Sequence, residues 1–105
     1  MTSPANMSSN TGICEWYAYF VRMPNNALYC GITTDVERRF SQHCQGKGAK
    51  ALKGKSPLTL VWSENAGTTR SDATKLELYL KRLPKQTKEA LVSGELSLTQ
   101  VVEAN

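Results

Sequence analysis

Two apolar patterns divide the chain into predicted strands and predicted helices. Residues 16–22 (WYAYFVR) and 28–32 (LYCGI) are rich in aromatic and β-branched residues, and turn-forming Pro and Asn residues lie between them. Together they predict a β-hairpin. Residues 57–64 (PLTLVWSE) have a similar composition and predict a third strand.

Helical spacing appears directly after the hairpin. Thr34 and Glu37 have the spacing of a capping box, which predicts that Thr34 caps a helix. Apolar residues then recur at four-residue steps, as expected for the buried stripe of a helix. This stripe consists of Val36, Phe40 and Cys44. Arg39 and His43 are also four residues apart, so they share a face beside the stripe.

The second half of the chain predicts two further helices. A Gly- and Lys-rich connector, with a short helical turn near residues 49–52, leads to the third strand. A long helix follows, with an apolar face of Ala73, Leu76, Leu80 and Leu83. Pro84 interrupts it and begins another helix that continues to Gly94, and the last residues form either a short helix or a frayed tail. The order β-β-α-β-α-α predicts a small α+β domain in which helices flank a three-stranded antiparallel sheet.

The length of 105 residues is sufficient for one domain with one modest core. We expect residues 1–14 to be a disordered lead-in, 15–94 the folded domain and 95–105 a tail. The first twelve residues are rich in Ser, Asn and Thr and do not resemble a signal peptide, and no apolar run approaches the ~20 residues of a membrane helix. We therefore expect a cytoplasmic protein without a membrane partner.

The cysteines do not predict a metal site. Cys14, Cys30 and Cys44 form an odd set without CxxC spacing, and the chain has one histidine, so the four ligands of a zinc site are missing. Free thiols are typical of a reducing compartment, and we interpret all three as small packing residues.

Basic charge is concentrated in one part of the chain. Residues 35–88 contain twelve Lys or Arg against five Asp or Glu, whereas the rest of the chain contains one Arg against four Glu. This distribution favours an anionic polymer as partner, although a Lys-rich solvated surface would have the same composition.

The polar residues near the predicted element ends suit phosphodiester chemistry better than acyl transfer, because one His and few acids make a Ser-His-Asp set improbable. A tyrosine can accept a proton from water when positive charge lowers its pKa. An arginine holds phosphate oxygens in a fork, and a carboxylate binds a hard divalent cation. Tyr19, Tyr29, Arg39 and Glu77 provide these groups.

These residues lie in segments that together resemble the GIY-YIG nuclease superfamily, and in particular its small single-domain bacterial members. "YAY" at 17–19 stands for the GIY element and "YCG" at 29–31 for the YIG element. "GITTDVERRFSQH" at 31–43 is similar to the family's glycine, helix and arginine, and "TKLELYLKRL" at 74–83 to its later helix with a glutamate. The resemblance covers about residues 15 to 93.

The resemblance implies a metal-dependent nuclease. Tyr19 or Tyr29 would activate water, Arg39 would stabilise the phosphate, and Glu77 would hold a single Mg²⁺ or Mn²⁺. His43 would assist near the phosphate or orient a tyrosine. We expect nucleic-acid contacts from Gly31, Lys47, Lys50, Lys53, Lys55, Lys81 and Lys85. Many family members have an asparagine after the glutamate, whereas this chain has Lys81 in that neighbourhood. This departure from the family pattern affects what the resemblance implies about substrate positioning.

We therefore expect a DNA endonuclease of low sequence specificity that selects DNA by structure, as in repair or recombination. The choice of DNA over RNA as the substrate rests on the resemblance alone, so RNA remains an alternative substrate. One alternative is a nucleic-acid-binding module with weak or no cleavage, and another is a scaffold whose basic surface docks a protein partner of unknown identity. Glu77 also has an ordinary alternative, an ion pair with Lys81 four residues on.

The hairpin provides a geometric test. A two-residue Asn25–Asn26 loop would pair Tyr29 with Arg22 and place Tyr19 and Tyr29 on opposite faces, because side chains alternate along a strand. A shared site therefore requires a three-residue loop or a bulge, which changes the parity of one strand.

Overall fold

The computed structural model describes residues 14–103. The elements are β1 (Trp16–Arg22), β2 (Leu28–Thr33), α1 (Val36–Cys44), a 3₁₀ turn (Lys50–Leu52), β3 (Thr59–Gly67), α2 (Arg70–Arg82), α3 (Lys85–Ser93) and α4 (Leu98–Glu103). The three strands form one antiparallel sheet in the order β2-β1-β3, so β1 lies at its centre. The predicted α+β class and the order of elements are confirmed.

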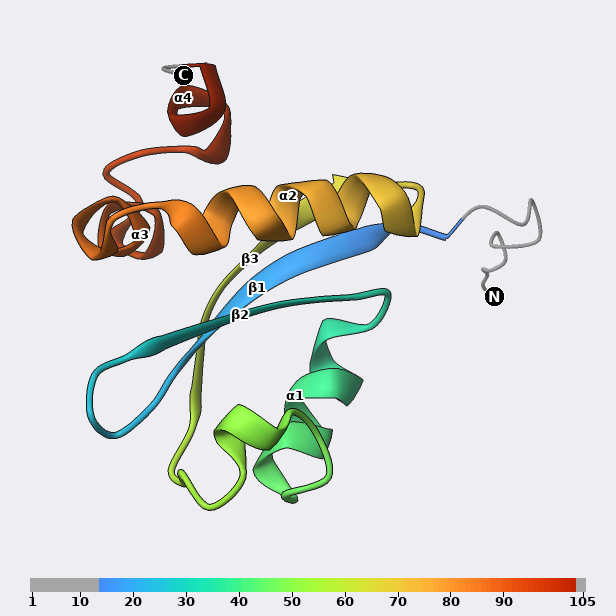
Figure 1. The fold of residues 1–105 in the computed structure, drawn as a ribbon, viewed down its shortest axis with the longest axis vertical. Coiled ribbons are helices and arrows are strands. Elements are labelled where there is room, and N and C mark those ends of the chain that lie inside the picture. The colour runs from blue at the N-terminus through green and yellow to red at the C-terminus, as the bar shows by residue number, and fades with distance from the viewer. Residues whose placement is uncertain (1–13, 104–105) are drawn as a thin grey trace, which may run out of the picture.

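One face of the sheet packs against α2, and α3 and α4 lie on the same side (Figure 1). Ala18 and Phe20 of β1 are completely buried there, and the Phe20 ring stacks on Trp62 of β3 with centroids 4.8 Å apart. Ala73 and Leu80 of α2 are buried against them, which confirms the predicted apolar face of this helix. This face therefore contains the larger hydrophobic core.

The opposite face of β1 and β2 packs against α1 and the segment that follows it (Figure 1). Tyr19 and Val21 of β1 are buried here with Leu52 of the 3₁₀ turn, and Val36 and Phe40 of α1 pack against them. The central strand thus has a core on each side, and the second, smaller core contains the candidate site residue Tyr19.

The ends of several elements differ from the expectation. The third strand begins at Thr59 rather than at residue 57, and it continues to Gly67. The C-terminal segment forms α4, whose Val101 is buried in the larger core, so the helix is the correct one of the two alternatives. The predicted lead-in lies outside the described residues except for position 14. Within residues 14–103, no helix has both the length and the apolar character needed to cross a membrane.

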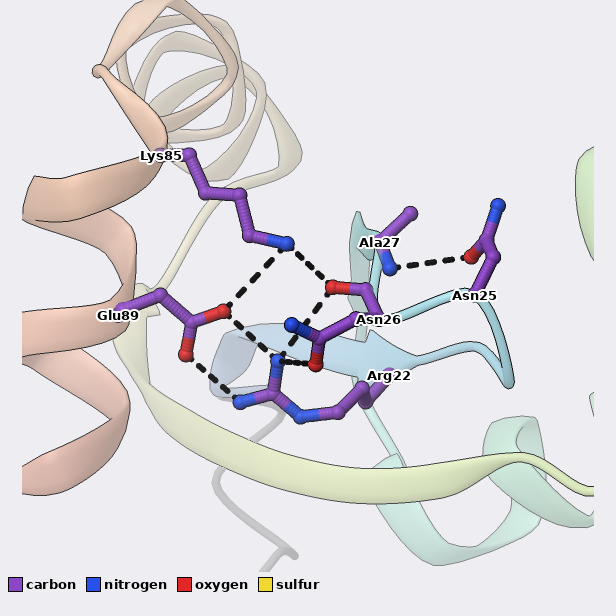
Figure 2. A network of polar contacts seen from close by, with 6 residues as sticks. All are labelled: Arg22, Asn25, Asn26, Ala27, Lys85 and Glu89. Carbon is purple, nitrogen blue, oxygen red and sulfur yellow. Dashed lines mark hydrogen bonds and ion pairs between the residues drawn. The ribbon is translucent and has the colours of Figure 1, made fainter.

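A polar network connects the β1–β2 turn to α3 (Figure 2). Arg22 donates from two nitrogens to the two Glu89 carboxylate oxygens, each at 2.7 Å, and one of these nitrogens also donates to Asn26 Oδ1 at 2.9 Å. Lys85 donates to the Asn26 carbonyl and lies 3.6 Å from Glu89. The network holds the turn, and therefore the pairing of the two strands, against a helix from the other end of the chain.

Candidate active site

The β1–β2 turn places both candidate tyrosines on one face of the sheet. Met23 and Ala27 close a three-residue turn, in which Asn26 has a left-handed backbone (φ 72°). Tyr19 consequently pairs with Gly31, and Val21 pairs with Tyr29. Since paired residues share a face, Tyr19 and Tyr29 lie together, with ring centroids 6.4 Å apart. The predicted departure from a two-residue loop is confirmed.

Gly31 leaves room for the Tyr19 ring. A Cβ at position 31 would lie 2.5 Å from Tyr19 Oη and 2.7 Å from its Cζ, closer than such atoms approach in folded proteins. Gly31 is itself buried. The glycine at position 31 thus has an explanation within the fold, and its predicted contact with nucleic acid remains a prediction.

Helix α1 begins one residue later than expected. Its N-cap is Asp35, whose carboxylate accepts a hydrogen bond from the Arg38 N–H at 3.1 Å, so the prediction that Thr34 is the cap is wrong. Thr33 Oγ1 accepts from the Asp35 N–H at 3.1 Å and fixes the path into the helix. Asp35 takes the role because its own backbone is extended and its side chain reaches the first free N–H groups.

The C-terminal turn of α1 also differs from the predicted stripe. Cys44 is exposed, whereas His43 is only 2% exposed. The prediction that Cys44 is buried is wrong because the chain after the helix folds back over His43 and encloses it. His43 Nδ1 accepts a hydrogen bond from the Ala49 N–H at 3.1 Å.

The imidazole of His43 contacts both tyrosines. Its Nε2 lies 2.7 Å from Tyr19 Oη, and its ring centroid is 5.8 Å from that of Tyr19 and 5.6 Å from that of Tyr29. Burial, together with the positive charge of Arg39, lowers the pKa of His43 below the ordinary 6.5. The imidazole is therefore neutral at physiological pH.

Arg39 lies among these three residues. It is partly buried, and its guanidinium donates to Gln42 Oε1 at 3.0 Å, one helical turn away. Its positive charge opposes the rise in the pKa values of Tyr19 and Tyr29 and contributes to the lowered pKa of His43, so it lies close to all three residues. Beside it opens a polar hollow of about 190 Å³ lined by Thr33, Thr34, Asp35, Arg38, Arg39 and Gln42.

The two phenols differ in environment. Burial raises the pKa of Tyr19 to about 12, and this side chain is only 1% exposed. Burial also raises the pKa of Tyr29, but the positive charges of Lys81 and Arg39 oppose the shift, and the residue is partly exposed. Tyr29 is therefore the more exposed of the two tyrosines.

Glu77 approaches the site from α2, the helix on the other face of the sheet. Its side chain is 19% exposed and lies 3.4 Å from Lys81 Nζ, so the ordinary ion pair is present. The negative charge of Glu77 raises the pKa values of Tyr29 and of its neighbour Cys30. Tyr29 and Cys30 point to opposite faces of the sheet, and the charge of Glu77 affects the pKa of both. The carboxylate therefore lies near the β2 edge of the sheet, where α1 and α2 both approach this strand.

The predicted lysines fall into separate groups. Lys47, Lys50, Lys53 and Lys55 are exposed around the 3₁₀ turn. Lys81 is half exposed beside Glu77, whereas Lys85 belongs to the network of Figure 2. Their predicted contacts with nucleic acid remain predictions.

Two site positions were missed by sequence reasoning, Gly48 and Ala49. Both contact His43, and a Cβ at Gly48 would overlap its Nδ1. The glycine spacing in the connector was visible, but which side chain the glycine accommodates depends on how the connector folds back.

The arrangement can be compared with known proteins. The sequence profile of the GIY-YIG catalytic domain matches residues 15–90. A UPF0213 protein of Vibrio cholerae is 58% identical over 86 residues, which cover 82% of this chain and 85% of that protein. A UPF0213 protein of Cronobacter sakazakii is 56% identical over 90 residues, covering 86% and 94%. The solution NMR structure of a UPF0213 protein from Bacillus halodurans is 34% identical, covers 82% of this chain and 90% of that one, and has a TM-score of 0.49.

Proposed function

Because this chain belongs to the GIY-YIG catalytic-domain family, we propose that it is a metal-dependent endonuclease that hydrolyses phosphodiester bonds in DNA. The observation that carries the proposal is the convergence of Tyr19, Tyr29, Arg39 and His43 from three elements on one face of the sheet. Packing alone gives no reason to surround two phenols with an arginine and a buried imidazole.

In this proposal the two tyrosines have different roles. Tyr29 accepts the proton of the attacking water, since it is the phenol that solvent can reach. Its pKa is raised in the protein alone, so it needs additional positive charge before it can act as a base. Tyr19, which is buried and keeps its proton at neutral pH, holds the geometry of the site.

Glu77 is the proposed metal ligand. Within residues 14–103, no group of three or more His, Cys, Asp or Glu side chains could hold a metal ion. In this proposal Glu77 is the single carboxylate that holds it. A lone, partly buried carboxylate fits Mg²⁺ or Mn²⁺, which keep several waters and complete their shell with substrate phosphate. When bound, such an ion supplies positive charge that lowers the pKa of nearby groups and neutralises the phosphate.

Arg39 is the proposed phosphate ligand. Its bond to Gln42 fixes the guanidinium at the rim of the polar hollow, where a phosphate could accept two parallel hydrogen bonds. The exposed lysines 47, 50, 53 and 55 would contact the backbone of the same nucleic acid on either side. Such contacts carry no sequence information, and we therefore propose low sequence specificity with selection by DNA structure, as in repair or recombination.

The test is cleavage of linear, branched and single-stranded DNA with Mg²⁺ or Mn²⁺ by the wild-type protein and by Glu77→Gln and Arg39→Ala. Both variants should lose at least about 10²-fold in rate, the scale of one electrostatic contact at a transition state. Glu103→Gln, which removes an exposed carboxylate on α4, is the matched control and should cleave like wild type.

Cleavage that survives both substitutions would contradict the proposed site. Binding without cleavage by the wild-type protein on every substrate and with either metal would favour the alternative of a binding module. Both the nuclease and the binding module require DNA affinity to fall as the salt concentration rises, because lysines that contact the phosphates release counterions from them. An affinity that does not depend on salt would favour the protein-docking scaffold instead.

A further inference from the structure

The segment after α1 contributes Leu52 and Ala49 to the smaller core, and it also encloses His43. Gly48 lies against the imidazole so closely that a Cβ there would overlap Nδ1 and lie 2.8 Å from Cε1. The next residue, Ala49, donates its backbone N–H to Nδ1 at 3.1 Å. The imidazole is 2% exposed, so water does not compete for this nitrogen.

This contact determines which nitrogen carries the proton. A backbone N–H can only donate, so Nδ1 must be unprotonated and act as the acceptor. In the neutral imidazole the proton is then on Nε2, which lies 2.7 Å from Tyr19 Oη. His43 is therefore the donor in that hydrogen bond, and the phenol oxygen is the acceptor.

We propose that Gly48 and Ala49 are positioning residues that hold His43 as the Nε2–H tautomer, and that His43 orients Tyr19 as a fixed hydrogen-bond donor without transferring a proton. The proposal rests on the proposed nuclease function for its activity tests, but not for its structural test. It resolves the two roles expected for His43, help at the phosphate or orientation of a tyrosine, in favour of orientation.

The charged and titratable groups around the imidazole are consistent with a fixed state. They are Tyr19 from β1, Tyr29 from β2 and Arg39 from α1 itself. Burial raises the pKa values of both phenols, and the positive charge of Arg39 opposes protonation of the neutral imidazole. In the protein without metal or substrate, no change of charge in this cluster is expected near neutral pH.

The structural test is ¹⁵N NMR of histidine-labelled protein, without substrate or metal. His43 is the single histidine of the chain, so its two nitrogens give the only imidazole signals. Above about pH 6.5, the ordinary imidazole pKa, we expect a protonated Nε2 and a bare Nδ1. A proton on Nδ1, or a charged ring at neutral pH, would overturn the proposal whether or not the protein is a nuclease.

Gly48→Ala should disturb this state, because the added methyl group displaces the ring from the Ala49 N–H. We expect mixed tautomers in its spectrum. The matched control is Gly46→Asn in the same segment: Gly46 has φ +77°, which asparagine tolerates, and open space around its Cβ. The control should keep the wild-type spectrum, and equal spectral changes in the two variants would overturn the role of Gly48.

The activity test separates a donor from a proton carrier. His43→Gln places an amide N–H near the Nε2 position, so it should retain cleavage within about tenfold, the effect of one imperfect hydrogen bond, with an unchanged pH profile. His43→Phe, which offers no donor, should lose more activity. A loss of about 10²–10⁴-fold in His43→Gln, with one limb of the pH profile removed, would identify a proton-transfer residue and overturn the proposal.

Gly48 should act through His43 and not independently of it. The loss of activity caused by Gly48→Ala should therefore shrink in the His43→Gln background, where no ring occupies that space. Strictly additive losses would contradict this. Circular dichroism and thermal unfolding of each variant identify any protein that has failed to fold, and only folded variants enter the comparison.

Discussion

Gly31 connects the packing of single residues to the geometry of the site. The Tyr19 ring occupies the place where any other residue at position 31 would have its Cβ, and both residues are buried. Gly31→Ala should therefore destabilise the fold by about 1–3 kcal/mol through overpacking. Urea unfolding measures this change.

The Tyr19→Leu background distinguishes a local clash from a general loss of strand stability. It removes Oη and Cζ, the two atoms nearest to the new methyl group, so Gly31→Ala should destabilise this background less than wild type. Equal destabilisation in both backgrounds would show that Tyr19 is not the reason for a glycine at position 31.

Single residues also show why part of the site could be predicted. Arg39 and His43 were expected on one face because of their helical spacing. Tyr19 and Tyr29 were expected together because the family resemblance implies a shared site, which strand alternation allows only with an odd turn or a bulge. The enclosure of His43 could not be predicted, because it depends on Gly48 and Ala49 folding back along a path that no periodicity encodes.

At the scale of elements, the network of Figure 2 joins the β1–β2 turn to α3. The Arg22 guanidinium lowers the pKa of Glu89 below 4.5 by hydrogen bonding and charge. A lowered pKa means that the bridge stabilises the protein above about pH 4.5 and that this contribution is lost as pH falls through the folded-state value. Stability measured against pH should show this loss on the acidic side.

Glu89→Gln should remove that pH dependence together with about 0.5–1 kcal/mol of stability at neutral pH, since the pair is partly exposed. Urea unfolding at neutral and acidic pH measures both effects. A variant that retains the wild-type difference between the two pH values would show that another carboxylate is responsible.

The order and type of the elements followed from apolar patterns, whereas several boundaries did not. Thr and Asp are both good N-cap residues. Which of Thr34 and Asp35 caps the helix depends on the backbone conformation of the chain between β2 and α1. The third strand extends beyond its predicted end at residue 64 because Asn65 and Gly67 pair with β1, although the Asn65 side chain is exposed. The tertiary structure determines which strand residues pair, and the apolar pattern of the sequence does not show it.

At the scale of the whole molecule, the sheet separates two cores with different contents. The larger core is completed by α4, where Val101 is 4% exposed and its neighbour Val102 is 46% exposed. The four residues closest to the proposed chemistry, apart from Glu77, lie with the smaller core or beside it. Stability and activity should therefore respond separately to some substitutions.

Val101→Ala should lower the free energy of unfolding by about 2 kcal/mol, because it removes buried methyl groups and leaves a gap. Val102→Ala makes the same chemical change at an exposed position of the same helix and should have little effect. Below its melting temperature, Val101→Ala should cleave DNA like wild type. A large loss of stability in both variants, or a loss of cleavage in folded Val101→Ala, would contradict the separation of the two cores.

The three-residue turn between β1 and β2 also limits how this gene can change over generations. Loss or gain of one codon within it would carry Tyr29 to the far side of the sheet unless a second insertion or deletion restored the parity. Many surface turns tolerate insertions and deletions freely. In this turn, a change in length by an odd number of residues moves Tyr29 to the other face of the sheet, whereas a change by an even number does not. Lineages that retain the proposed activity should therefore vary this turn in steps of two residues, or accept a compensating bulge in a neighbouring strand.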